Sequence, residues 1–182
     1  MTDLSPSQRA QVERVRALIA PVPDFPKPGI LFRDITPLLA SPEGFRDAIS
    51  LLEALSGELK PTHIVGAESR GFLFGLPLAQ ALQVPFIPAR KPGKLPRQVA
   101  SQAYSLEYGE DALEVHAEDL PQGARVLFVD DLLATGGTAA ACVKLIEGLG
   151  AEVVGCLFLI ELEGLNGRAQ LGSVTCLAPI SY

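Results

Sequence analysis

A nearly continuous apolar segment that ends in two acids and a glycine-rich turn constrains this chain more than any other feature. Residues 125–129 (RVLFV) are typical of a strand buried on both faces at the centre of a parallel sheet. Asp130 and Asp131 follow, and residues 134–138 (ATGGT) lead into a helix predicted for 138–149. A strand, a tight turn and a helix in this order indicate an open α/β sheet, in which ligands bind at the carboxyl ends of the strands.

The rest of the chain alternates between the same two kinds of element. Apolar runs predict strands at 63–66, 84–89, 153–160 and 174–177. Periodic apolar positions and capping residues predict helices at 5–20, 41–55 and 72–82. Strands that alternate with helices in this way predict an α/β fold with a mostly parallel sheet.

Two segments interrupt this alternation and are predicted to be irregular. Prolines between residues 21 and 28 stop the first helix, and the apolar side chains of Phe25 and residues 30–32 predict an ordered, buried loop there. Residues 91–103 are rich in proline and polar residues and are predicted to be a long loop. A hairpin of strands 104–108 and 112–116 is expected to follow, with its turn at 109–111.

Composition and charge exclude several classes of protein. The length of 182 residues suits a single domain, and 48% hydrophobic with 20% charged residues is a globular composition. The net charge of −6 argues against nucleic-acid and membrane-surface partners. No apolar run approaches the roughly 20 residues of a membrane span, and the N-terminal residues lack the apolar core of a signal peptide. We therefore expect a cytoplasmic protein.

The cysteines and histidines are predicted to have structural roles. Cys142, Cys156 and Cys176 are widely separated in apolar surroundings, so we expect buried free thiols. Zinc sites usually need close Cys or His pairs, and no C-x-x-C is present. His63 and His116 are also far apart in the sequence.

The turn after residues 125–129 has the chemistry of a phosphate site. Gly136 and Gly137 let several backbone N–H groups point inward, the helix start adds its positive end, and Thr135 and Thr138 add hydroxyl donors. The patterns of a P-loop and of a dinucleotide fingerprint are both absent. The preceding acids can accept hydrogen bonds from ribose hydroxyls or bind a metal ion. The simpler alternative is an ordinary strand-turn-helix junction.

The full string VDDLLATGGT at residues 129–138 resembles the phosphoribosyl-diphosphate (PRPP) motif of the type I phosphoribosyltransferases. Four further segments, in order along the chain, are similar to adenine phosphoribosyltransferases: 24–37 (DFPKPGILFRDITP), 68–75 (ESRGFLFG), 90–96 (RKPGKLP) and 104–109 (YSLEYG). One departure is Glu68, where family members often carry Asp; the charge is kept.

The resemblance implies a fold, a reaction and partners. The fold is the type I phosphoribosyltransferase fold, a mostly parallel central sheet flanked by helices in a single domain, 1–182. It would carry an N-terminal helix and hood at about 1–40 and a flexible lid loop at about 91–108. The reaction converts adenine and PRPP to AMP and diphosphate in purine salvage. Mg²⁺ would be held mainly through PRPP, with no direct protein ligand, and the chain would form a homodimer.

The resemblance also assigns roles to individual residues. Asp130 and Asp131 would hold the ribose hydroxyls, and the rest of the motif would bind the 5-phosphate of PRPP: Ala134, Thr135, Gly136, Gly137 and Thr138. The diphosphate would bind a second group of side chains: Ser69, Arg70, Lys91 and Lys94, with Arg90 as a further candidate. An arginine at a helix start opposes the helix dipole, which favours a functional role for Arg70.

Base recognition is expected to come from outside this motif. Enzymes for hypoxanthine and guanine usually carry an acid where this chain has Ala134, and that acid interacts with the purine N7. The family's candidate for this role here is the catalytic Glu107, which would contact adenine N7 and assist proton movement. The base itself would be held by four residues: Leu31, Phe32, Arg33 and Leu132.

Two other functions stay open from the sequence. One is a phosphoribosyltransferase for another purine, such as hypoxanthine or xanthine. The other is a non-catalytic sensor of PRPP or purines on the same fold. A DNA-binding sensor would need an added helix-turn-helix domain and a basic face, and the first 20 residues are too short for that domain.

Overall fold

The structure, a computed structural model, describes residues 4–106 and 109–182. The chain divides into two compact units, Met1–Leu51 and Leu52–Tyr182, and helix α3 (Pro42–Ser56) crosses from one to the other. The prediction of one domain over 1–182 therefore stays a prediction, and each unit is described by itself. In the described part of the chain, no helix has both the length and the apolar character needed to cross a membrane.

The N-terminal unit consists of helices and one antiparallel hairpin. Helix α1 (Pro6–Ala17) begins at a capping box between Ser5 and Gln8 and is shorter than predicted. Strands β1 (Ala20–Pro23) and β2 (Leu31–Asp34) pair where a loop was predicted, and α2 (Thr36–Leu39) follows.

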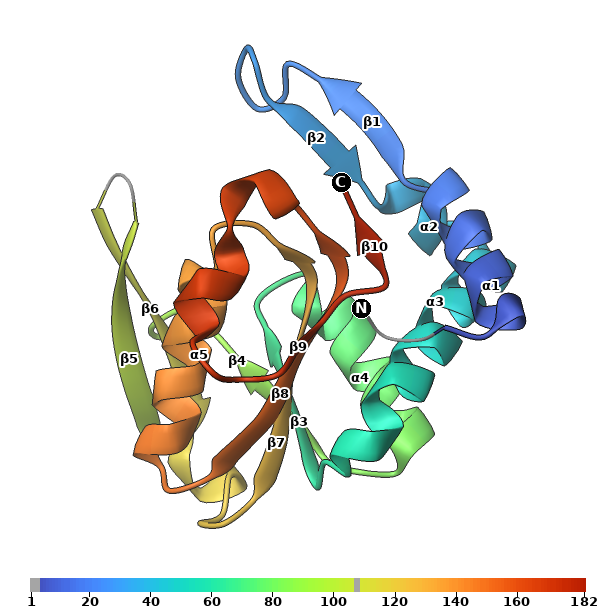
Figure 1. The fold of residues 1–182 in the computed structure, drawn as a ribbon. Helices are drawn as coiled ribbons and strands as arrows, with labels where there is room; N and C mark the ends of the chain where they lie inside the picture. Colours follow the sequence, from blue (N-terminus) through green and yellow to red (C-terminus); the bar gives the residue numbers. More distant parts are fainter. Residues whose placement is uncertain (1–3, 107–108) are drawn as a thin grey trace. The chain divides into compact units, whose positions relative to one another are not determined.

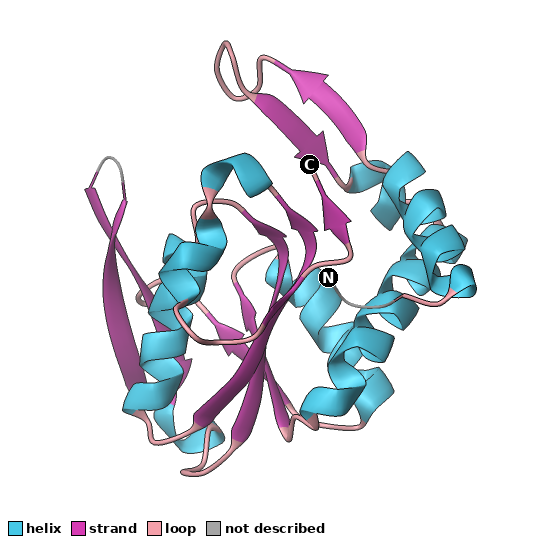
Figure 2. Ribbon diagram, viewed as in Figure 1, coloured by secondary structure: helices cyan, strands magenta, loops and turns pink. Residues whose placement is uncertain are grey.

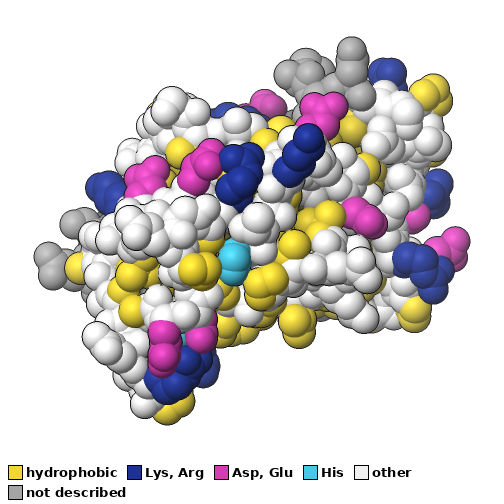
Figure 3. All heavy atoms as spheres, turned by 90° about the horizontal axis from the view of Figure 1, so that it is seen from below, with side chains coloured by type: hydrophobic (Ala, Val, Ile, Leu, Met, Phe, Trp, Pro, Cys, Tyr) yellow, Lys and Arg dark blue, Asp and Glu magenta, His cyan; other side chains and the backbone are white. Residues whose placement is uncertain are grey.

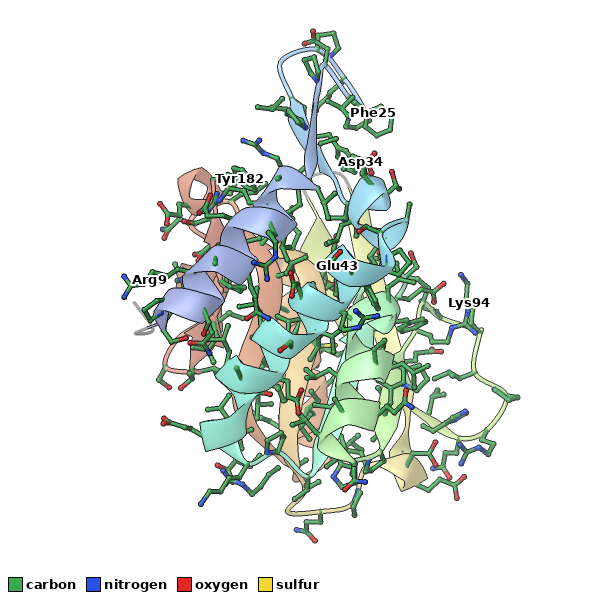
Figure 4. The ribbon with its side chains drawn as sticks, turned by 90° about the vertical axis from the view of Figure 1, so that its right-hand side faces the viewer. Arg9, Phe25, Asp34, Glu43, Lys94 and Tyr182 are labelled. Carbon is green, nitrogen blue, oxygen red and sulfur yellow. The ribbon has the colours of Figure 1, made fainter. Side chains whose placement is uncertain are left out.

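The apolar tip of this hairpin is more exposed than the sequence predicts. Phe25 is 51%, Ile30 42% and Leu31 48% exposed, and Figure 4 shows Phe25 near the tip. A two-stranded ribbon has no second layer to cover these side chains. Phe32 and Phe25 contact each other edge-to-face, at 5.1 Å between ring centroids.

The second unit is built on the parallel sheet that the sequence predicts. Its strands are β3 (His63–Ala67), β4 (Phe86–Ala89), β7 (Arg125–Leu133), β8 (Glu152–Glu161), β9 (Cys176–Leu177) and β10 (Ile180–Ser181). The order is β10-β8-β7-β3-β4, with β9 also paired to β8, and every pairing is parallel (Figure 1). The chain moves outward from β3 to β4 on one side and from β7 to β8 on the other.

Helices cover both faces of this sheet (Figure 2). Helix α5 (Gly137–Gly148) packs with Val126 and Phe128 of β7 in the main hydrophobic cluster. The alternate residues of β7, Leu127 and Val129, are equally buried but lie outside that cluster, on the face covered by α4 (Gly71–Leu82). Both faces of β7 are therefore dry, as its apolar sequence predicts. Short 3-10 turns complete the unit: Gly57–Leu59, Ala117–Asp119, Glu163–Leu165 and Gly167–Leu171.

The predicted lid loop at about 91–108 needs correction. Strand β5 (Val99–Leu106) takes up its second half and pairs with β6 (Gly109–His116) in an antiparallel hairpin. Residues 109–111, predicted as the turn, belong to β6. The remaining loop is anchored at its start, because Arg90 and Glu114 exchange two backbone hydrogen bonds of 2.8 Å.

The three cysteines are free, as predicted. Cys142 and Cys156 are fully buried and Cys176 is half-buried. Burial raises the pKa of Cys156 to about 12 and that of Cys176 to about 11, so both remain protonated at neutral pH.

Acidic side chains lie beside basic ones on the surface seen in Figure 3. Arg97 pairs with Glu118 and Asp119, and Arg125 pairs with Glu152 at 2.9 Å. Solvent screens pairs of this exposed kind, so they contribute little to stability and the burial of apolar side chains contributes most of it.

Two glycines allow α4 to pack closely on the sheet. A Cβ on Gly66 of β3 or on Gly75 of α4 would lie 2.7 Å from the same ring carbon of Phe86. Phe72 meets the Phe86 ring edge-on at 5.8 Å between centroids, which limits its movement.

We predict that Gly75→Ala lowers the free energy of unfolding by about 1–2 kcal/mol, because overpacking outweighs the better helix propensity of alanine. Gly148→Ala is the matched control, since a Cβ there meets nothing within 4 Å and α5 should be unchanged or stabilised. Urea unfolding measures both. An unfolding midpoint for Gly75→Ala equal to that of Gly148→Ala would contradict this packing argument.

Candidate active site

A cavity of about 250 Å³ opens where β3 and β7 end. The strand order reverses between these two neighbours, which is where open α/β sheets bind ligands. Residues from both strand ends and from the loop at 90–98, which we call the basic loop, line the cavity. The lining residues are Glu68, Ser69, Arg70, Lys91, Asp130, Asp131, Leu132, Leu133, Ala134, Thr135, Gly136, Gly137, Thr138, Ala139 and Phe158. Of the eleven residues that the sequence assigns to PRPP or its diphosphate, ten line this cavity and Lys94 does not.

The glycine turn has the backbone geometry of an anion site. Gly136 takes φ +85°, the left-handed conformation that glycine adopts without strain, and α5 begins directly after it. No side chain of the described residues caps this helix at Gly136. The first N–H groups of α5 therefore face the cavity end without a side-chain acceptor, and the positive end of the helix dipole adds to their field.

A second glycine, Gly167, holds this turn in place. A Cβ on Gly167 would overlap the carbonyl oxygen of Ala134, and a Cβ on Gly136 would overlap the carbonyl oxygen of Gly167. The neighbouring Arg168 donates two hydrogen bonds, of 2.7 and 2.6 Å, to the buried carboxylate of Glu161 at the end of β8. No local sequence signal predicts this contact, because the two glycines are far apart along the chain.

The two acids near the end of β7 share an electrostatically strained position, in which Asp131 is buried and Asp130 is half-buried. Burial raises the pKa of Asp130 well above its usual value, and the charge of Asp131 raises it further. Burial also raises the pKa of Asp131, while the guanidinium of Arg70 opposes that rise. The Asp130 Oδ1 atom accepts the N–H of Asp131 at 2.9 Å.

One oxygen of this pair lacks a hydrogen-bond donor. Asp131 is 3% exposed at its side chain, and its Oδ2 atom lies 3.1 Å from Nε of Arg70, which is an ion-pair distance. The geometry is nevertheless not that of a hydrogen bond, and within the described residues this buried oxygen accepts none. A buried acceptor without a donor is costly, so a ligand hydroxyl would be favoured here.

Arg70 reaches this carboxylate because its helix starts very close to β7. A Cβ on Gly71 would lie 2.8 Å from the carbonyl oxygen of Val129 and 3.0 Å from Oδ1 of Asp130. Only glycine allows this approach. It places Ser69 and Arg70 at the same cavity as the acids, as the sequence predicts.

The basic loop is tied to Glu68. Its carboxylate accepts hydrogen bonds from Lys94 Nζ at 2.6 Å, from the Lys91 N–H at 3.0 Å and from Arg90 Nε at 3.3 Å. The Lys94 hydrogen bond, followed by that of Lys91, lowers the pKa of Glu68 to about 2. Lys94 (labelled in Figure 4) therefore lies at Glu68 and is not among the cavity-lining residues.

Lys91 does line the cavity, and residues of the β5–β6 hairpin position its side chain. Its Nζ atom donates to the Tyr104 hydroxyl at 2.9 Å and forms a short ion pair with Asp111. Burial lowers the pKa of Lys91, but these partners outweigh burial and raise it. The Tyr104 ring lies next to Gly137, since a Cβ there would be 4.0 Å from it. The sequence predicted Lys91 but not these partners.

The residues assigned to the base are placed less completely. Leu132 lines the cavity, whereas Leu31, Phe32 and Arg33 lie on β2 of the N-terminal unit. Glu107 lies outside the described residues. Glu68, Leu133, Ala139 and Phe158 also line the cavity and were not assigned to it from the sequence, although Glu68 belongs to a segment that carried the family resemblance.

Among the described residues, no three His, Cys, Asp or Glu side chains gather as a metal site. The cavity is lined by the carboxylates of Glu68, Asp130 and Asp131, and carboxylate oxygens are ligands that Mg²⁺ accepts. They fit an ion that keeps most of its ligands from water and phosphate.

Comparison with known proteins gives a consistent result. Residues 34–171 match the model of the phosphoribosyl transferase domain. Adenine phosphoribosyltransferase from Synechocystis sp. is 56% identical over 170 residues, which cover 92% of this chain and 99% of that protein.

Solved structures agree. The adenine phosphoribosyltransferase of Thermoanaerobacter pseudethanolicus has a TM-score of 0.91 and 47% identity, covering 94% of this chain and 99% of that one. The Trypanosoma brucei adenine phosphoribosyl transferase, in complex with AMP, pyrophosphate and ribose-5-phosphate, has a TM-score of 0.86 and 27% identity, covering 100% of this chain and 82% of that one. The chain therefore belongs to the adenine phosphoribosyltransferase family.

Proposed function

We propose that this chain transfers the 5-phosphoribosyl group of PRPP to adenine in the cavity at the ends of β3 and β7. The activity follows from membership of the family: adenine and PRPP give AMP and diphosphate, a reaction of purine salvage. The observation that supports the location is the junction of the glycine turn, the two acids and Arg70 around one cavity. The assignments below are specific to this chain.

We assign the 5-phosphate of PRPP to the start of α5. Its N–H groups, the positive helix end and the hydroxyls of Thr135 and Thr138 supply the donors, with Ala134, Gly136 and Gly137 shaping the turn. We assign the ribose hydroxyls to Asp130 and Asp131. A hydroxyl that donates to the buried Oδ2 of Asp131 would satisfy the oxygen that has no donor in the protein.

We assign the diphosphate to Ser69, Arg70 and Lys91, with Lys94 recruited from Glu68. Bond breaking at the anomeric carbon leaves positive charge on the ribose and negative charge on the departing diphosphate. Positive groups fixed beside the leaving group stabilise that charge separation, and the buried carboxylates lie on the ribose side. Mg²⁺, held mainly by PRPP oxygens and water, would add positive charge at the diphosphate.

We assign adenine to Leu132 and to residues 31–33 of β2, with Glu107 contacting N7. Ala134 brings no carboxylate to the base, which supports a source elsewhere in the chain. We also propose a homodimeric, cytoplasmic protein of one domain. The exposed Phe25 and Leu31 of the hairpin are apolar surface that an assembly or a bound base would cover.

We expect turnover with PRPP, Mg²⁺ and adenine, and at least 100-fold less with hypoxanthine, xanthine or guanine, on the order of other sites that read a polar edge. Glu107→Gln should cut adenine turnover by roughly 10²-fold, as for a lost general acid or base. Release of diphosphate, measured with each purine, checks both. Near-normal adenine turnover in Glu107→Gln would remove the role assigned to that residue.

Replacing Asp130 or Asp131 with alanine should lower turnover by roughly 10²-fold or more, the loss typical of a contact that stabilises developing charge. Steady-state kinetics with PRPP varied measures it, and thermal melting checks that each variant folds. Normal PRPP kinetics in both variants would overturn the assignment of the ribose site.

Gly167→Ala should raise the KM for PRPP by about tenfold or more, because displacement of the turn by 1 Å or so misplaces the phosphate. The KM for adenine should change little. Gly164→Ala is the matched control three residues earlier, where a Cβ meets nothing within 4 Å. An unchanged KM for PRPP in Gly167→Ala, with the parent melting temperature, would contradict the idea that Gly167 holds the phosphate-binding turn in place.

A further inference from the structure

An acid lines a cavity to which we assign a polyanion. Glu68 follows β3 directly, its side chain is 13% exposed, and it is among the cavity-lining residues beside Ser69 and Arg70. A carboxylate in this position repels a diphosphate unless cations compensate it. Its partners are the cations of the basic loop, Lys94 at 2.6 Å and Arg90 at 3.3 Å.

Glu68, Arg90 and Lys94 are each in contact with the other two. Arg90 donates from Nε to Glu68 and from one terminal nitrogen to the carbonyl oxygen of Lys94 at 3.3 Å. Lys94 returns to Glu68 through its side chain. One carboxylate therefore holds both cations at the edge of the cavity.

The backbone of the loop has an independent anchor. Arg90 is bridged to Glu114 by two backbone hydrogen bonds, and the N–H of Gly93 donates to the Glu114 carboxylate at 3.1 Å. Removal of the Glu68 charge should therefore release the lysine without detaching the loop. Because its partners lower the pKa of Glu68 to about 2, the carboxylate is charged at neutral pH.

We propose that Glu68 is an internal counter-ion that competes with diphosphate for Lys94 and Arg90, and so weakens the binding of the product that must leave. This inference rests on the proposed function, because it takes the diphosphate to bind beside Ser69 and Arg70. Glu68 acts through the two cations and is a positioning residue; it does not touch the reacting atoms. When diphosphate enters, Lys94 exchanges one anionic partner for another, and the exchange reverses on release.

Glu68→Gln tests the charge separately from the shape. The amide oxygen of glutamine can still accept the N–H of Lys91, while its charge is gone. We expect the inhibition constant of diphosphate, measured with Mg²⁺ against PRPP, to fall about fivefold, the value of one half-exposed ion pair. Glu68→Asp keeps the charge and should stay within about twofold of the parent.

AMP affinity is the internal reference, because AMP has no diphosphate. A general loosening of the site would change the dissociation constants of AMP and diphosphate together, whereas a counter-ion effect changes only the second. Calorimetry with AMP alone and with Mg²⁺ and diphosphate alone gives both constants for each variant.

Glu114→Gln is the matched control. It removes one negative charge from the other anchor of the same loop, and Glu114 does not line the cavity. Diphosphate affinity should not change. An equal gain in diphosphate affinity in Glu114→Gln would show that the effect depends on net charge, and it would overturn the proposal. Unchanged or weaker diphosphate binding in Glu68→Gln would also overturn it.

Arg70→Ala separates this inference from the function it rests on. If Arg70→Ala loses diphosphate binding while Glu68→Gln shows no gain in diphosphate affinity, the counter-ion role of Glu68 is rejected. The assignment of the diphosphate site would then still hold. Parent-like diphosphate binding in both variants would reject the diphosphate site itself.

Discussion

The parallel pairing of β3 with β7 is the constraint on which the site depends. Gly66 pairs with Val129 in this register, so β3 ends at the level of the two acids while β7 continues to Leu133. Their onward connections lead to opposite sides, because β4 lies beyond β3 and β8 beyond β7. The crevice between the two departing chains is therefore a product of topology, and Gly71 keeps it narrow by letting α4 approach the end of β7.

The narrowness of this crevice has an electrostatic cost. Asp130 and Asp131 are adjacent, the pKa of each is raised, and one oxygen of the buried Asp131 has no hydrogen-bond donor among the described residues. A hydrophobic pair would make a more stable fold at this place. Ligand hydroxyls that donate to this oxygen would offset the cost, so part of the free energy of ligand binding would come from satisfying Asp131.

The parts of this structure that the sequence predicts are those set by local pattern. A short, nearly continuous apolar run that ends in turn residues is typical of a strand buried on both faces, and β7 is one. The glycine turn was predictable because the φ of Gly136 and the start of α5 are encoded within a few residues. The family resemblance added Ser69, Arg70 and Lys91, which the topology does bring to one cavity.

The parts that the sequence did not predict depend on distant partners. Residues 99–103 alternate too little in polarity to read as a strand, and β5 forms because β6 pairs with it. The hairpin of β1 and β2 was not predicted, because its prolines favoured a loop. The edge strands of a two-stranded ribbon tolerate proline. Gly167 and Gly136 are separated in the sequence by α5 and β8 and meet only in the folded unit, so no local sequence signal marks their contact.

The lysines of the basic loop show how a site for a polyanion can be ordered before its ligand binds. Each has an acid that the reaction itself does not need, Asp111 for Lys91 and Glu68 for Lys94. Without these acids, the like charges of the lysines would repel each other and their side chains would lose fixed positions, while the loop backbone would stay anchored at Glu114. With them, the cations are positioned in advance, and affinity for diphosphate is reduced by the competition. Since diphosphate is a product as well as part of a substrate, an affinity limited in this way favours turnover over tight binding.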